Sequence, residues 1–177
     1  MERQVFFISG SYGVGKSTLC DKLSHSLQIP SYSASDLISI RVNEQYGAQK
    51  SVKDKNVNQQ ALIHAVQDIP VEESKIILSG HFCIFNRNKE VDLLPESVFS
   101  SLEIKKIILL ETDPIIISER LLTRDNVSYP IESIKTLIDT EHNQALAIAE
   151  QLKCPLLIHK MQFNNSDVVA LSEFLSC

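Results

Sequence analysis

The stretch that decides the fold is FFISGSYGVGKSTLCDKL, residues 6–23, in which an apolar run stops at a glycine-rich turn and a helical pattern follows. The pattern G-x-x-x-x-G-K-[ST] is satisfied here by Gly10, Gly15, Lys16 and Ser17. In such a turn, successive backbone N–H groups bind phosphate oxygens, and the start of the helix adds a partial positive charge. Lys16 can reach the β- and γ-phosphates, and Ser17 can coordinate Mg²⁺. We therefore expect the turn to bind a nucleoside triphosphate with its magnesium ion.

Apolar stretches and helical patterns alternate along the rest of the chain. Strands are expected at residues 4–9, 29–34, 74–80, 104–111 and 155–159, and helices at 16–27, 35–46, 59–69, 114–124, 128–152 and 166–175. Residues 81–102 are expected to be irregular with a short helix, and 47–58 to form a polar, lysine-rich connection. The alternation predicts an α/β fold with a parallel sheet of about five strands, covered by helices on both faces.

Composition limits the classes of partner. The 177 residues suit one domain, expected to span 1–177, and a net charge of −5 gives no basic surface for nucleic acid or an anionic membrane. No apolar stretch approaches the length of a membrane span, so we expect a cytoplasmic protein. The four cysteines, at 20, 83, 154 and 177, lack metal-ligand spacing and are expected to be structural thiols.

Three classes of protein use such a phosphate-binding turn, and other segments favour one of them. A GTPase would carry D-x-x-G, which is absent, and NKEVD at 88–92 has one residue too many for the guanine-reading motif. A motor-type ATPase would end a strand with an acidic pair, which Glu111 and Asp113 could supply, but Asp113 before Pro114 favours a helix cap. A small kinase needs arginines near the transferred phosphoryl group, and Arg120 and Arg124 lie four residues apart on one predicted helix.

The sequence resembles the small P-loop kinases related to adenylate kinase, most closely the archaeal-type and nuclear adenylate kinases with short lids. The segments that carry this resemblance are GSYGVGKSTL (10–19), IPSYSASDLI (29–38), IILSGHF (76–82), IILLETDPIIISERLLTRD (107–125), IESIKTLIDTEHNQALAIA (131–149) and CPLLI (154–158). The resemblance implies a P-loop NTPase three-layer α/β/α sandwich, with an acceptor-binding helical region at about 35–70 and a short lid at about 120–130.

The resemblance also implies roles for single residues. The triphosphate would be bound by Gly10, Gly13, Val14, Gly15, Lys16, Ser17 and Thr18, with Mg²⁺ on Ser17. Arg120 and Arg124 would close on the phosphates, and His81 would face the reaction centre. Asp36 and Arg41 would contact the acceptor.

Two departures from the family keep alternatives open. Adenylate kinases commonly carry an aspartate at the position of Ser79, where it helps to order the water around magnesium. Arg41 also lies further from Asp36 than in these kinases, and Lys50, Lys53 and Lys55 could bind another anionic acceptor or be merely solvated. The leading hypothesis is transfer of the γ-phosphoryl group of ATP to a small acceptor, such as a nucleoside monophosphate or another metabolite. The alternative is a nucleotide-gated regulatory or ATPase protein that binds a protein partner.

Overall fold

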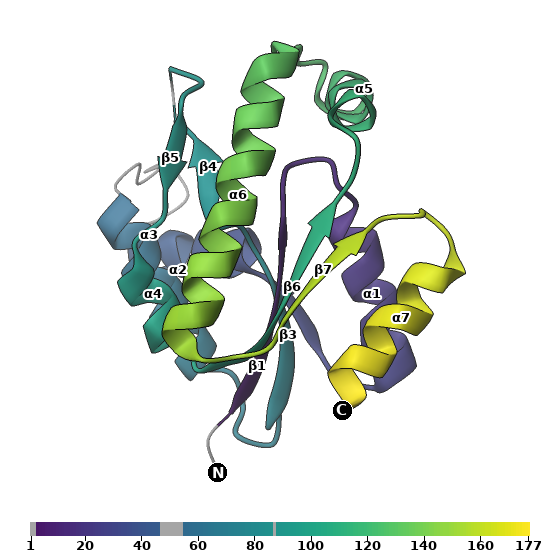
Figure 1. The fold of residues 1–177 in the computed structure, drawn as a ribbon. Helices are drawn as coiled ribbons and strands as arrows, with labels where there is room; N and C mark the ends of the chain where they lie inside the picture. Colours follow the sequence, from purple (N-terminus) through teal and green to yellow (C-terminus); the bar gives the residue numbers. More distant parts are fainter. Residues whose placement is uncertain (1–2, 47–54, 87) are drawn as a thin grey trace.

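A computed structural model describes residues 3–46, 55–86 and 88–177 of the chain (Figure 1). Along these residues the elements are β1 (Gln4–Gly10), α1 (Lys16–Leu27), β2 (Ser31–Ser33), α2 (Ala34–Tyr46), α3 (Lys55–Gln67), β3 (Lys75–Ser79), β4 (Cys83–Phe85), β5 (Val91–Leu93), α4 (Glu96–Ser101), β6 (Ile104–Glu111), α5 (Pro114–Asp125), α6 (Ile131–Leu152), β7 (Leu156–Lys160) and α7 (Asn165–Ser176). No described helix is both long and apolar enough to span a bilayer.

The main sheet has five parallel strands in the order β2-β3-β1-β6-β7, which confirms the α/β fold expected from the sequence. β1 lies at the centre, between β3 and β6, so the loop that follows it leaves the middle of the sheet. Connections from β1 and β3 run to opposite sides of this centre, and ligands of open parallel sheets bind at the carboxyl ends of strands where the order reverses in this way. The topology thus places the glycine-rich loop at the usual ligand-binding edge.

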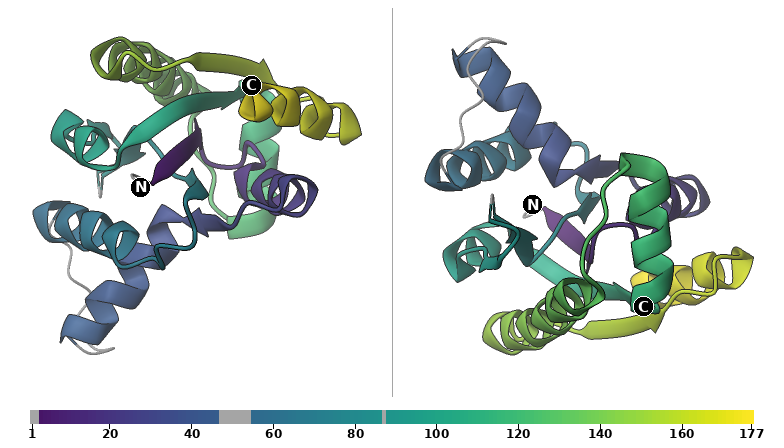
Figure 2. Two further views of the ribbon diagram at one scale, coloured as in Figure 1. Left: turned by 90° about the horizontal axis from the view of Figure 1, so that it is seen from below. Right: turned by 90° about the horizontal axis from the view of Figure 1, so that it is seen from above.

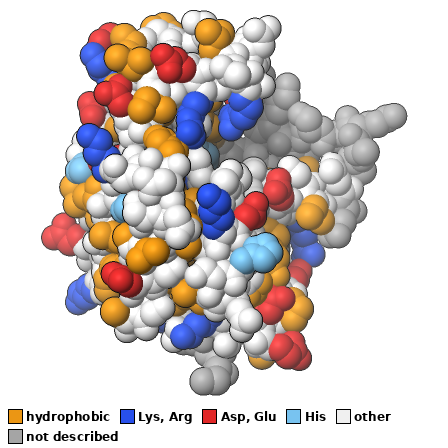
Figure 3. Space-filling view, turned by 90° about the vertical axis from the view of Figure 1, so that its right-hand side faces the viewer, with side chains coloured by type: hydrophobic (Ala, Val, Ile, Leu, Met, Phe, Trp, Pro, Cys, Tyr) orange, Lys and Arg blue, Asp and Glu red, His pale blue; other side chains and the backbone are white. Residues whose placement is uncertain are grey.

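Helices cover both faces of the sheet, as the views from below and above show (Figure 2). Alternate strand residues enter two core clusters: Phe7 and Leu109 pack with α3, α4 and α6, whereas Ile8 and Ile108 pack with α1 and α7. Strands buried on both faces must be apolar at nearly every position, which explains the continuous apolar runs in the sequence. On the face at the right of Figure 1, the described acidic and basic side chains are interspersed (Figure 3).

A β-hairpin replaces the irregular segment expected at 81–102. β4 and β5 pair antiparallel, with Cys83 opposite Leu93 and Phe85 opposite Val91. The side chain of Asn86 accepts hydrogen bonds from the backbone N–H groups of Asn88 (2.8 Å) and Glu90 (3.0 Å), which closes the turn. The prediction of an irregular segment was wrong because three-residue strands are too short to show a clear alternation. The expected short helix is present as α4.

The helices agree with the sequence apart from their ends. α3 begins at Lys55, four residues before the expected start at 59. Most of the expected connection, 47–54, lies outside the described residues. Asp113 accepts a hydrogen bond from the backbone N–H of Ile115 (2.8 Å), with Pro114 in the first turn, so the predicted cap of α5 is confirmed. Its neighbour Glu111 pairs instead with Nδ1 of His142 (2.6 Å).

Candidate active site

The loop between β1 and α1 has the backbone of a phosphate cradle. Gly10 has φ 149°, and a Cβ atom there would lie 2.6 Å from the carbonyl oxygen of Leu110, so only glycine fits. Gly15 ends the loop in the left-handed region, with φ 102°, as the N-cap of α1. No side chain caps this helix, which leaves its positive end available to an anion.

Lys16 is folded over the loop it follows. Its Nζ donates to the carbonyl oxygens of Gly10 (2.6 Å) and Ser11 (3.0 Å). Burial lowers the pKa of Lys16 to about 8, partly offset by the nearby carboxylate of Glu141. The hydrogen bonds that this ammonium donates within the described structure go to carbonyl oxygens, and a bound triphosphate would place negative charge directly against it.

A cleft of about 1050 Å³ opens beside this loop. We call one side of it the phosphate end, which is lined by the loop, α1 and α5 through Tyr12, Gly13, Gly15, Lys16, Ser17, Thr18, Glu119, Arg120, Thr123 and Arg124. The other side, the far end, is lined by Phe7, Ser33, Ala34, Ser35, Ile38, Asn58, Gln59, Leu62, Ser79, Gly80, His81, Ile84, Leu94, Val98 and Phe99. The cleft is therefore continuous from the glycine-rich loop to a chamber between α2, α3 and α4.

Both predicted lid arginines line the phosphate end from α5. Arg120 donates from Nη1 to the carbonyl oxygen of Gly13 (3.4 Å), and its guanidinium lies 3.9 Å from the centroid of the Phe163 ring. This distance is typical of a cation–π contact. Arg124 forms two hydrogen bonds with Asp125, each 2.6 Å long. The two guanidinium groups are thus held differently, Arg120 against the loop and Arg124 by a carboxylate.

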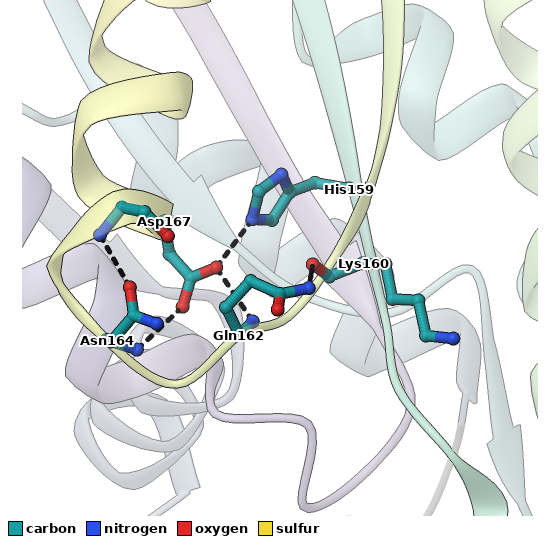
Figure 4. A network of polar contacts seen from close by, with 6 residues as sticks. His159, Lys160, Gln162, Asn164 and Asp167 are labelled. Atoms are coloured by element: carbon teal, nitrogen blue, oxygen red, sulfur yellow. Dashed lines mark hydrogen bonds and ion pairs between the residues drawn. The ribbon is translucent and has the colours of Figure 1, made fainter.

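A polar network fixes the turn that carries Phe163 (Figure 4). The buried carboxylate of Asp167 accepts from Nε2 of His159 (2.7 Å) and from the backbone N–H groups of Gln162 (2.9 Å) and Asn164 (3.2 Å). Burial alone would raise the pKa of Asp167, but these hydrogen bonds outweigh it and hold the pKa below its ordinary value. The aromatic ring beside Arg120 is therefore set by an anchored turn.

Glu141, in the middle of α6, ties the glycine-rich loop to the segment after β3. Its carboxylate is 1% exposed and accepts from the backbone N–H groups of Gly10 (3.2 Å), Phe82 (3.0 Å) and Cys83 (2.9 Å). The Cys83 thiol also donates to it, at 3.2 Å. Burial raises the pKa of Glu141, and the backbone donors, the thiol and Lys16 oppose the rise. These backbone donors belong to two segments, Gly10 in the loop and Phe82–Cys83 after β3, and one carboxylate fixes both against α6.

An aromatic column links the loop to the segment before α6. Tyr12 packs on His81 with ring centroids 4.5 Å apart and on Phe85 at 6.0 Å, and Phe85 stacks on Tyr129 at 4.9 Å. Nδ1 of His81 is buried and forms no hydrogen bond within the described structure. Burial, reinforced by the charge of Lys16, lowers the pKa of His81 well below its ordinary value, so the ring is neutral.

A family model described as an AAA domain matches residues 9–138, which is most of the chain. This chain belongs to that family. No match to a curated protein was found. Two solved structures have the same fold: a gluconokinase from Sinorhizobium meliloti 1021 (13% identity, TM-score 0.56, covering 98% of this chain and 95% of that chain) and a provisionally assigned kinase from Chloroflexus aurantiacus j-10-fl (16%, 0.57, 99% and 98%). At these identities the likeness shows a shared fold alone, and the match to the family model identifies it as the P-loop NTPase fold.

Most of the site residues predicted from the sequence lie together in the cleft of this AAA-domain protein. Gly13, Gly15, Lys16, Ser17, Thr18, Arg120, Arg124 and His81 all line it. Gly10 contributes through its backbone, as acceptor from Lys16 and donor to Glu141. Val14, expected at the nucleotide, has a fully buried side chain in the core.

The predicted acceptor residues lie elsewhere. Asp36 is exposed in the first turn of α2, and Arg41 forms a salt bridge with Asp68 (2.8 Å); neither is among the described residues that line the cleft. Their role stays a prediction without support from this arrangement. Lys50 and Lys53 lie outside the described residues, as does the side chain of Lys55.

Sequence reasoning missed several groups at the site. Glu141 had a signal, because a carboxylate in the buried stripe of an amphipathic helix is rarely left unpaired. Phe163 and Gln59 had none, since each becomes part of the site only through tertiary packing. Ser79, where an aspartate was expected, is buried and donates to the carbonyl oxygen of Tyr32 (3.4 Å).

Proposed function

We propose that this protein transfers the γ-phosphoryl group of ATP to a small acceptor. The observation that carries this proposal is that one cleft joins the phosphate cradle and its arginines to a second chamber. A protein that only hydrolyses ATP needs no site for a second substrate, whereas a phosphotransferase must hold a second molecule beside the γ-phosphate. The thiols are free of disulfides in the structure, which suits the cytoplasm, where ATP is available.

The residues of the phosphate end suit a magnesium triphosphate. Ser17 is an exposed hydroxyl at the start of α1, and no group of three or more His, Cys, Asp or Glu side chains within the described ranges forms a metal site of its own. Mg²⁺ keeps several waters and binds proteins through few ligands together with the phosphates of the substrate. Ser17 would hold the ion in this way, and the bound ion would neutralise charge on the phosphates.

The chain's own residues position and neutralise the reacting group. Lys16 would bind the β- and γ-phosphates, with Arg120 and Arg124 nearby on α5. Such electrostatic stabilisation and alignment supply most of the catalysis in phosphoryl transfer. Neutral His81 would offer one hydrogen bond to a molecule in the far end. The resemblance to adenylate kinases makes a nucleoside monophosphate the simplest acceptor to test, beside unphosphorylated metabolites.

The test is ADP formation from Mg-ATP with and without a panel of acceptors. Lys16→Ala should abolish triphosphate binding or lower turnover at least a hundredfold, because the cradle loses the ammonium group that would bind the β- and γ-phosphates. The matched control is Lys22→Ala, an exposed lysine on the same helix away from the cleft. If ATP binds but no acceptor raises ADP formation, the proposed transfer reaction is refuted.

Ser79 favours a second candidate function, a nucleotide-gated regulatory protein that binds ATP and hydrolyses it slowly while contacting a protein partner. Ser79 lacks the carboxylate that would order magnesium-bound water. In Ser79→Asp, a large gain in ATP turnover without an acceptor would favour this second function. Unchanged hydrolysis together with acceptor-dependent turnover would favour the kinase.

A further inference from the structure

The two ends of the cleft differ in charge. Among the described residues that line it, every charged side chain belongs to the phosphate end: Lys16, Glu119, Arg120 and Arg124. The far end is lined by aliphatic and phenyl groups, by the hydroxyls of Ser33, Ser35 and Ser79, by amides and by the imidazole of His81. Such a surface binds an apolar body and a few hydrogen-bonding groups, and the residues of it that the structure describes offer no counter-charge to an anion.

Two buried polar atoms of the far end form no hydrogen bond with any residue that the structure describes. One is Nε2 of Gln59, which lines the chamber from α3, and the other is Nδ1 of His81. Leaving a buried donor or acceptor unpaired costs about 1–3 kcal/mol. A molecule that offers these two atoms hydrogen bonds removes that cost, so the far end is suited to a neutral polar group between apolar walls.

The negative charges of ATP itself would balance the positive charges of the phosphate end. Lys16 and Arg120, with the magnesium ion, face the charges of a triphosphate, and Arg124 is already paired to Asp125 through two hydrogen bonds. A phosphate or carboxylate on the acceptor would therefore add negative charge that no described cation of the cleft is placed to balance. Burying such an unpaired charge is costly.

We propose that the acceptor is an uncharged alcohol that carries a flat aromatic ring with hydrogen-bonding groups at its edge, the chemical class of nucleosides, and not a monophosphate or a sugar acid. This inference rests on the proposed phosphoryl transfer. The hydroxyl oxygen of the acceptor would bond to the γ-phosphorus as the bond from that phosphorus to the β–γ bridging oxygen breaks. ADP leaves with that oxygen, and the hydroxyl proton passes to water.

Binding is tested separately from chemistry. The protein is first saturated with Mg²⁺ and a non-hydrolysable ATP analogue, so that the nucleotide site is occupied. Four nucleosides and their four 5′-monophosphates are then titrated in pairs, with the side-chain amide signal of Gln59 and the ring signals of His81 followed by NMR. We expect the dissociation constants of the nucleosides, obtained from these shifts, to be at least tenfold lower than those of the matching monophosphates.

Variants of one side chain sharpen the test. Gln59→Leu should weaken nucleoside binding about tenfold without changing ATP affinity, whereas Gln60→Leu, at an exposed neighbour on the same helix, should leave both unchanged. Gln59→Arg should reverse the preference, because the new guanidinium gives a monophosphate its missing partner.

The outcomes are distinguishable. A monophosphate that binds more tightly than its nucleoside overturns the inference, and so does the failure of every nucleoside to shift either signal. Nucleoside binding without acceptor-dependent ADP formation from Mg-ATP supports the far-end chemistry but refutes phosphoryl transfer.

Discussion

Lys16 couples nucleotide binding to pH. Its pKa is about 8 in the free protein, and the negative charges of a bound triphosphate will raise it. Between these two pKa values the complex holds a proton that the free protein has lost, so affinity must fall as pH rises. We expect ATP affinity to fall by up to tenfold per pH unit above about pH 8. Calorimetry in two buffers of different ionisation enthalpy should show proton uptake at pH 9. Lys16→Arg should abolish the uptake, and equal affinity at pH 7 and 9.5 would refute the assignment.

A second prediction concerns the buried carboxylate of Glu141. Glu141→Gln keeps the shape of the side chain but turns an N–H₂ group toward backbone donors, leaving at least one of them unsatisfied. We expect a loss of about 3 kcal/mol in the free energy of unfolding. We also expect weaker ATP binding, since Gly10 loses its anchor. Urea unfolding and calorimetry measure these effects. The control is Glu150→Gln, at an exposed position on the same helix. If Glu141→Gln is as stable as the wild type, the carboxylate of Glu141 does not stabilise the fold.

At the scale of elements, the stack of Phe85 on Tyr129 holds the β4–β5 hairpin against the segment between α5 and α6. We predict that Tyr129→Ala will destabilise the protein by about 1 kcal/mol and speed hydrogen exchange in residues 83–93 and 126–130. Tyr129→Phe keeps the ring and should leave exchange unchanged. Exchange that rises equally in β1 and β6 would instead indicate a global loss of stability, contradicting a local role for the column.

Some elements of the fold could be predicted from the sequence alone and others could not. The loop, α1 and the five parallel strands were predictable, because the signal for each lies within its own residues. The cap of α5 at Asp113 was predictable for the same reason. The hairpin was not, since its two strands are three residues long. The helical pattern marks Glu141 as a buried carboxylate that needs partners, but the partners themselves were not predictable, because they lie 131, 59 and 58 residues away in the chain.

For the whole molecule, the core and the cleft share residues. Phe7, Leu62, Val98 and Phe99 belong to the larger core cluster and also line the far end. Their burial means that shortening any of them to enlarge the chamber also removes core contacts, at about 2–5 kcal/mol per residue. Changes of acceptor are therefore best sought at Gln59 and Ser35, which line the same chamber but do not belong to that cluster.

His81 links the stability of the whole molecule to pH. Its pKa in the folded protein lies well below 6.5, near which the unfolded chain titrates. Below pH 6.5 the unfolded chain therefore binds a proton that the folded protein does not, so the free energy of unfolding must fall as pH falls. Between pH 6.5 and 5.5 we expect this residue to account for a loss of about 1 kcal/mol. Urea unfolding of the wild type and of His81→Gln at both pH values measures it: the wild type should lose about 1 kcal/mol more than the variant. Parallel losses in the two proteins would mean that His81 is protonated in the folded state.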